Sequence, residues 1–200
     1  LAKAELTLGI ALALAEVMGL KDNPVTVQQL VDLAVDVQTS RTCIRAAELD
    51  PEMTVGGHSV PNQLHLAGAA VNVFKSRQRM SEILRGLPGS SLIVAPADTD
   101  FTDLSMATEL EEAYGGGGYT ALQRAAVLQL GWDHVASELD ARESVFELHA
   151  SGGLSAWRAQ LRSWFSSYDE LANGVQQFLD VELPLMDLSS LRNAPYERPR

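Results

Sequence analysis

The fold of this chain is decided by residues 119–153, which read YTALQRAAVLQLGWDHVASELDARESVFELHASGG. The apolar side chains recur three or four positions apart, so one long helix would place them on a single side. These side chains belong to Ala125, Leu128, Trp132, Val135, Ala136, Leu139 and Phe146. We expect this side to face the core. The helix is predicted to end at Gly152 and Gly153, because glycine permits a left-handed cap.

Arg142 lies at the edge of this apolar stripe, one helical turn after Glu138. Glu followed by Arg at i,i+4 is a favourable order. A surface pair of this kind would contribute well under ~1 kcal/mol. Alternatively, the guanidinium is partly buried and binds a phosphate or orients the loop that follows. The position at the edge of the stripe favours a structural or cofactor role.

Three further helices are predicted upstream, over about residues 2–18, 26–49 and 61–85, with a short acidic helix over 105–114. Gly19 would cap the first, and Thr26 with Gln29 would form a capping box at the start of the second. Residues 53–62 are expected to form a loop and 91–95 a short extended run. The predicted core stripes contain Leu30, Leu33, Val37, Ile44, Leu64, Ala67, Val71 and Phe74. The fold class is therefore all-α.

Four consecutive glycines at residues 115–118 precede the central helix. A glycine run can bind phosphate, but this one lacks a flanking strand and a following Lys-Ser/Thr pair. The hinge interpretation is therefore favoured over a phosphate loop.

A second stripe runs through Trp157, Leu161, Trp164, Tyr168, Leu171, Val175 and Phe178. Its alternating spacing of four and three is typical of helices packed side by side. It could close the core of this domain or form an interface with another subunit, and both interpretations stay open. Asn173-Gly174 is expected to interrupt the helix, and residues 184–200 are predicted to form an extended tail.

Charge and composition exclude several classes of partner. The 200 residues carry a net charge of −11, which disfavours nucleic acid and anionic membranes as partners. The single cysteine, Cys43, rules out an intrachain disulfide. The four histidines lack the spacing of a metal site, and His134 is expected to be solvated on the polar side of its helix. We therefore predict a cytoplasmic protein that binds no metal.

Several motifs occur in an order and spacing that resemble the 4-hydroxyphenylacetate 3-monooxygenase family. The C-terminal set is Trp132-Asp133, Ser137-Glu138, Arg142, Phe146-Glu147 and Ser151-Gly152. The upstream set is Val60-Pro61-Asn62, the run RMSEIL at residues 79–84, and SLIVAP at 91–96 followed by Asp100-Phe101. The resemblance covers nearly the whole chain but only the C-terminal part of such an enzyme.

The resemblance implies the C-terminal helical bundle of an acyl-CoA dehydrogenase-like fold, over residues 1–183. By this resemblance, the N-terminal helical and β-barrel domains of the family would be missing from this sequence, which starts at Leu1 inside an apolar helical pattern. Members of the family are flavin-dependent aromatic hydroxylases. They take reduced FAD from a separate flavin reductase and hydroxylate a phenol ortho to its hydroxyl through a flavin C4a-hydroperoxide. This segment alone is expected to be inactive.

By the same resemblance, four residues would lie beside the flavin: Arg142, His149, Ser151 and Gly152. His149 could donate to a flavin oxygen or phosphate, or it could simply be favoured at a helix C-terminus by the helix dipole. The catalytic residues would lie mostly in the missing N-terminal part. Assembly as a homodimer or homotetramer is expected.

The sequence also departs from the family. It has Glu147-Leu148-His149-Ala150 where relatives often carry Glu-Arg-Asn-Tyr, and Asp140-Ala141 where they carry Gly-Gly. These changes favour a specialised hydroxylase that acts on a modified or carrier-tethered phenol. Two alternatives stay open: a same-fold acyl-CoA-type dehydratase or desaturase, and a non-catalytic helical oligomerisation module.

Overall fold

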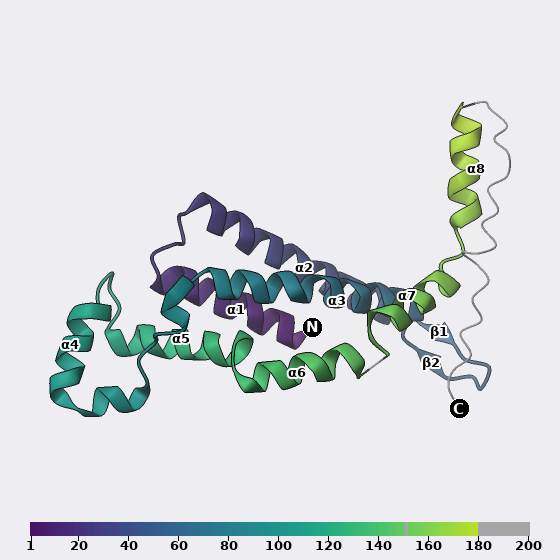
Figure 1. Ribbon diagram of the computed structural model, residues 1–200. Coiled ribbons are helices and arrows are strands. Elements are labelled where there is room, and N and C mark those ends of the chain that lie inside the picture. Colours follow the sequence, from purple (N-terminus) through teal and green to yellow (C-terminus); the bar gives the residue numbers. More distant parts are fainter. Residues whose placement is uncertain (151, 180–200) are drawn as a thin grey trace.

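The computed structural model describes residues 1–150 and 152–179 (Figure 1). Helices make up most of this part of the chain, so the predicted all-α class is confirmed. The α-helices are α1 (Ala2–Val17), α2 (Pro24–Leu49), α3 (Gln63–Gly86), α4 (Leu104–Tyr114), α5 (Ala121–Val135), α6 (Glu138–His149), α7 (Gly153–Trp164) and α8 (Tyr168–Leu179). The short elements are the strands β1 (Glu52–Met53) and β2 (Ser59–Val60) and the 3-10 helices η1 (Gly89–Leu92) and η2 (Asp98–Thr102).

The core lies where α1, α2, α3 and α5 pack together (Figure 1). The core residues of α2 and α5 lie on the predicted faces, whereas α3 contributes residues beyond its predicted stripe. The buried side chains include Ile10, Leu14, Leu33, Val37, Met80, Ile83, Leu84, Leu128 and Val135. At roughly 25 cal/mol per Å² of buried apolar surface, this cluster is the main stabilising contribution to the bundle.

The ends of α1 and α2 follow from their sequences. Gly19 has a φ of 69° and donates to Glu16 O, while Leu20 N donates to Ala15 O, which satisfies the last carbonyls of α1. The predicted glycine cap is confirmed. The predicted capping box at the start of α2 is wrong, because the helix begins two residues earlier. Asn23 accepts from the N–H groups of Val25 and Thr26 and caps it instead.

Helices α2 and α3 pack closely along their length. A Cβ atom added at Gly68 would lie 3.8 Å from Cys43 Sγ, so small side chains permit the close approach. Between them, the predicted loop is a short antiparallel hairpin in which Glu52 pairs with Val60. The backbone hydrogen bond from Thr54 N to His58 O continues it.

The predicted single helix over residues 119–153 is two helices. Ala136 leaves helical geometry with a φ of −140°, and Ser137 starts α6 as its N-cap by accepting from Asp140 N. The break rotates the second half of the stripe away from the core. Leu139 and Phe146, which were predicted to be buried, are 61% and 71% exposed.

The structure can be compared with the predictions for two loops, the extended run at 91–95 and the glycines at 115–118. The predicted extended run at 91–95 is wrong, because its first half belongs to the 3-10 helix η1. The glycines at 115–118 form a tight turn in which Gly116 and Tyr119 exchange backbone hydrogen bonds of 3.0 and 3.1 Å. Gly116, Gly117 and Gly118 all have positive φ, which explains why glycine is needed there.

The second predicted stripe is also divided between two helices. The break lies between Trp164 and Tyr168, so the expected interruption at Asn173-Gly174 is wrong. Helix α7 packs against α3, whereas α8 projects away from the body (Figure 1). The predicted tail at 184–200 lies outside the described residues. Within the described residues, no helix is long and apolar enough to cross a membrane.

Candidate functional site

A cavity of about 310 Å³ lies between the start of α1, the middle of α3 and the α5–α6 pair. Its apolar lining comes from Leu1, Ala4, Val73, Phe74, Met80, Phe146 and Ala150. Its polar lining comes from Lys3, Thr7, Arg77, Ser81, His134, Asp140 and Glu147. A mostly apolar cavity with a few convergent polar groups is the usual form of a small-molecule site.

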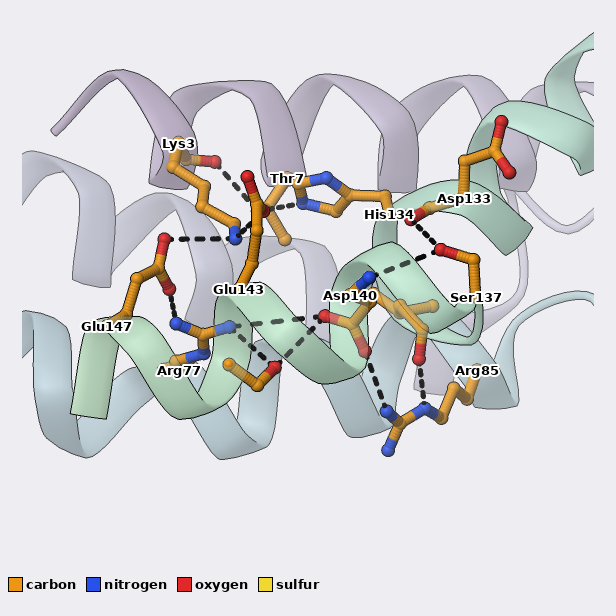
Figure 2. A network of polar contacts seen from close by, with 12 residues as sticks. Lys3, Thr7, Arg77, Arg85, Asp133, His134, Ser137, Asp140, Glu143 and Glu147 are labelled. Atoms are coloured by element: carbon orange, nitrogen blue, oxygen red, sulfur yellow. Dashed lines mark hydrogen bonds and ion pairs between the residues drawn. The ribbon is translucent and has the colours of Figure 1, made fainter. Parts of the chain in front are cut away.

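His134 projects from α5 into this region and bonds to Thr7 of α1 (Figure 2). The Thr7 hydroxyl donates its only hydrogen to Lys3 O at 2.8 Å. Thr7 Oγ1 must therefore accept from His134 Nε2, 2.7 Å away, which leaves Nδ1 of the neutral ring as an acceptor. Burial lowers the pKa of His134, and Lys3 lowers it further. The predicted solvated position of His134 is wrong.

Asp140 attaches α6 to α3. Its side chain is buried and lies between two arginines of α3 (Figure 2). The carboxylate accepts from Arg85 Nη2 at 3.4 Å and from Ser144 Oγ at 3.2 Å, and it lies 4.0 Å from Arg77 Nη2. Arg85 Nε also donates to Val135 O at 2.6 Å, at the C-terminal end of α5. Arg85 therefore ties together the two helices that meet at the break.

The other end of α6 is held by a second set of ion pairs. Lys3 Nζ lies 2.6 Å from Glu143 Oε2 and 3.0 Å from Glu147 Oε1. The hydrogen bond from Lys3 lowers the pKa of Glu143. Arg77 pairs with Glu147 from the α3 side. We call the contacts of Lys3, Arg77 and Arg85 with α6 the polar clasp.

Three of the residues predicted beside a flavin, Arg142, His149 and Gly152, lie on or just after α6. Arg142 is 77% exposed and pairs with Glu138 at 2.5 Å, so the predicted partial burial is wrong. His149 is exposed in the last turn of α6. Gly152 has a φ of 79° and is the N-cap of α7. Ser151 lies outside the described residues. Their role in cofactor binding stays a prediction.

The model of the 4-hydroxyphenylacetate 3-hydroxylase C-terminal family matches residues 1–180. The chain belongs to this family. The predicted resemblance is thereby confirmed.

Two curated relatives in this family carry informative names. The oxygenase component of 4-nitrophenol 4-monooxygenase/4-nitrocatechol 2-monooxygenase from Rhodococcus opacus is 27% identical over 72% of the chain and 27% of its own length. The pyoverdin chromophore biosynthetic protein PvcC from Pseudomonas aeruginosa is 29% identical over 62% of the chain and 25% of its own length. The chain therefore spans about a quarter of these relatives.

Solved structures show the same fold. The oxygenase component HpaB of 4-hydroxyphenylacetate 3-monooxygenase complexed with FAD has a TM-score of 0.81 and 26% identity, over 89% of this chain and 37% of that one. An archaeal 4-hydroxybutyryl-CoA dehydratase from N. maritimus has a TM-score of 0.76 at 14% identity, over 92% and 37%. This second match shows the fold alone. The expected helical domain of the acyl-CoA dehydrogenase-like type is confirmed.

The cavity residues could not be identified from the sequence. A local role was detectable only for Asp140, because Ser137 three positions earlier forms an S-x-x-D helix start. No local sequence pattern indicates the role of His134, since its partner Thr7 is 127 residues away. Among residues 1–150 and 152–179, no group of three or more His, Cys, Asp or Glu is placed to hold a metal ion.

Proposed function

We propose that this chain is the C-terminal helical part of a flavin-dependent oxygenase component that hydroxylates a phenol ortho to its hydroxyl. The observation that carries this proposal is the match, at 26% identity and a TM-score of 0.81, to an oxygenase component complexed with FAD. The family match over residues 1–180 and the relative that acts on 4-nitrophenol support the same reaction class. Reduced FAD would supply the oxygen-transfer chemistry, and a separate flavin reductase would supply the reduced FAD.

Three features of the α6–α7 corner support the proposal of a flavin site there. Gly152 provides no side-chain cap for α7, so the N–H groups of the first turn of this helix are available to an anion. Arg142 and His149 add hydrogen-bond donors on exposed side chains. Phe146, on the same exposed helix, offers apolar surface for a flat ring. We assign flavin binding to Arg142, His149 and Gly152 together with Ser151.

The glycines of this corner cannot be replaced without moving the backbone. A Cβ atom at Gly153 would lie 2.5 Å from Leu148 O, and one at Gly152 would lie 2.7 Å from Ala156 Cβ. Both glycines also have positive φ. The close approach of α7 to the end of α6 therefore depends on glycine, which keeps the corner compact enough for a flat ligand to reach the backbone.

The flavin assignment is tested by titrating FAD into the complete protein and following the quenching of flavin fluorescence. Arg142→Gln should weaken FAD binding about tenfold, the equivalent of losing one charge-assisted hydrogen bond. Arg45→Gln is the matched control, since Arg45 also makes an exposed pair, with Glu48 on α2, at 3.1 Å. Its FAD affinity should equal that of the parent protein. Complete absence of FAD binding by the parent protein would refute the proposal.

The reaction class is tested separately with ¹⁸O₂. The complete protein, supplied with reduced FAD by a reductase, should place one labelled oxygen on the ring of a phenol. An unlabelled product would instead support a dehydratase or desaturase of the same fold. A carrier-tethered substrate and a cytoplasmic location stay predictions.

The oligomerisation hypothesis is supported by α8. Its apolar residues Leu171, Val175 and Phe178 are all exposed, and Phe178 reaches 89%. We propose that this face packs in a homo-oligomer, as exposed apolar patches of this kind do. Phe178→Asp should shift the protein to a smaller species on gel filtration, whereas Gln177→Asp on the neighbouring exposed position should not. An unchanged elution volume for both variants would exclude this face as the interface.

A further inference from the structure

Helix α6 forms one wall of the cavity, but apolar packing does not hold it there. Phe146 and Glu147 line the cavity from this helix. The five apolar side chains of α6 are nevertheless exposed: Leu139, Ala141, Val145, Phe146 and Leu148. Asp140 is its buried residue. The burial of apolar surface that holds α1, α2, α3 and α5 together therefore contributes little to the position of α6.

Charge links α6 to the two helices on the other side of the cavity. The helix carries four carboxylates and one arginine, and the body presents Lys3, Arg77 and Arg85 to it. Three of the four carboxylates pair with these cations (Figure 2). Arg77 Nη2 also donates to Ser144 Oγ at 2.8 Å. The polar clasp is therefore the attachment of α6 to α1 and α3.

The polar clasp is open to solvent on several sides. The side chains of Lys3 and Glu143 are 35% and 50% exposed, and that of Arg85 is 55% exposed. Ion pairs between groups of this exposure are weak one by one and are screened by salt. The Debye length falls from about 10 Å at 0.1 M salt to about 3 Å at 1 M. Salt therefore weakens the clasp, whereas it does not screen the apolar contacts of the core.

The backbone departs from helical geometry at both ends of α6. Ala136, between α5 and α6, has a φ of −140°, and Ser137 begins the new helix. On the other side, Gly152 has a φ of 79° at the start of α7, which packs against α3. A few residues at the ends of an element are enough to act as hinges. The α6 helix can thus move relative to its two neighbours without disturbing their own helical geometry.

We propose that α6 is a strap that the polar clasp holds against the cavity, and that rising ionic strength releases it from α1 and α3 while the core stays folded. Release opens the cavity on the α6 side. The inference goes beyond the proposed function, because it concerns the attachment of one helix and requires neither a bound flavin nor a substrate. It is therefore measured on the 200-residue chain alone.

The first experiment follows amide hydrogen exchange by mass spectrometry at about 0.1 M and about 1 M potassium chloride. Peptides from α6 should exchange about 3- to 10-fold faster at the higher salt concentration, as expected for local opening. Peptides from α5 are the reference within the same molecule and should exchange at an unchanged rate. Exchange in α6 that does not respond to salt, or that rises equally in α5, overturns the inference.

Arg77→Met tests whether the clasp causes the salt response. This variant removes the contacts of Arg77 with Ser144 and Glu147, so α6 should exchange about 3- to 10-fold faster already at low salt and respond less to added salt. Arg41→Met is the matched control, because Arg41 on α2 makes an exposed ion pair with Glu5 of α1 at 2.7 Å. Its α6 exchange should equal that of the parent chain.

Lys3→Met, at a partly exposed position of α1, tests the same point if Arg77→Met does not fold. Lys3 pairs with two carboxylates of α6, so its loss should also speed exchange in this helix at low salt. A folded clasp variant that exchanges in α6 like the parent chain refutes the role of the clasp.

A second readout reports whether the cavity opens. Met80 lines the cavity and is 6% exposed, so a cysteine there is protected while α6 is in place. In a Cys43→Ala chain, Met80→Cys should react with the uncharged reagent N-ethylmaleimide about 3- to 10-fold faster at the higher salt concentration, in step with α6 exchange. Thr39→Cys, exposed on α2, is the control and should react at a salt-independent rate. Faster α6 exchange without faster Met80→Cys reaction would mean that α6 unwinds in place, which contradicts the strap.

Discussion

Asp140→Asn is the substitution that tests how α6 is attached. The Asp140 side chain is 5% exposed and accepts from Arg85 at 3.4 Å and Ser144 at 3.2 Å. Hydrogen bonds to charged groups contribute about 1.5–3 kcal/mol each. The Arg85 side chain is more than half exposed and its bond is long, so solvent screening reduces its contribution. Arg77 keeps its pair with Glu147 and is not left unpaired. We expect a loss of about 2 kcal/mol, below the 3–5 kcal/mol for breaking a fully buried pair.

The measurement is urea unfolding followed by far-UV circular dichroism and tryptophan fluorescence. A loss of about 2 kcal/mol should lower the urea midpoint by about 1 M at unchanged slope. The same loss should lower Tm by about 4–8 °C for a chain of this size. Glu138→Gln is the matched control, because Glu138 also lies in the first turn of α6 and the helix-dipole contribution is similar for both residues. Its stability should stay within about 0.5 kcal/mol. If Asp140→Asn were equally neutral, the polar clasp would not hold α6 to the body.

Four further predictions follow from single positions. Leu128→Ala removes a side chain with 0% exposure from the core and should cost about 2–5 kcal/mol in chemical unfolding. Gly153→Ala, with a φ of 67° and Leu148 O in the way of the new Cβ, should destabilise by about 1–3 kcal/mol. Gly9→Ala, inside α1 with open space around it, should stabilise by about 0.5–1 kcal/mol in the same assay. His134 should titrate below its ordinary pKa by NMR, since burial favours the neutral ring, with Lys3 and Arg77 opposing protonation and Asp140 and Glu143 favouring it. The unfolded chain then binds the extra proton, so the contribution of His134 to stability is constant above about pH 6.5 and is lost as the pH drops below it. A His134 titration at or above the ordinary value would contradict this assignment.

The helices of the core could be predicted because their apolar spacing is a local property. Leu33 and Val37 on α2, and Ala67 and Val71 on α3, are buried as predicted. Their periodicity selects one face of each helix, and that face packs against the other elements of the bundle. The glycine at position 19 marks the end of α1 for the same local reason, since few other residues adopt a positive φ.

The break after α5 could not be predicted from periodicity. Leu139 and Phe146 stay in phase with Leu128 on an unbroken helix, so the pattern continues across Ser137 as if nothing changed. The competing signal was the serine cap, which ends α5 and starts α6 in a new direction. In the structure, the serine cap and not the hydrophobic phase decides the direction of the chain at this point.

The candidate cavity could not be predicted because its contacts join distant parts of the chain. Thr7 and His134 are 127 residues apart, and Arg85 and Asp140 are 55 apart. Each of these side chains looks like an ordinary polar residue in its own helix. Only the packing of α1 and α3 against the α5–α6 pair turns them into partners.

The attachment of α6 explains why one side of this helix stays exposed. Among its side chains, Asp140 is the buried one, and the inward side bonds to α1 and α3 through charge. The large apolar side chains Leu139, Val145 and Phe146 are left mostly exposed. A helix held by ion pairs on one side retains its apolar surface for a ligand or partner on the other. The polar clasp therefore does two things at once. It closes one wall of the cavity around His134, and it leaves Arg142 and His149 on the exposed side of α6, where a bound group can reach them.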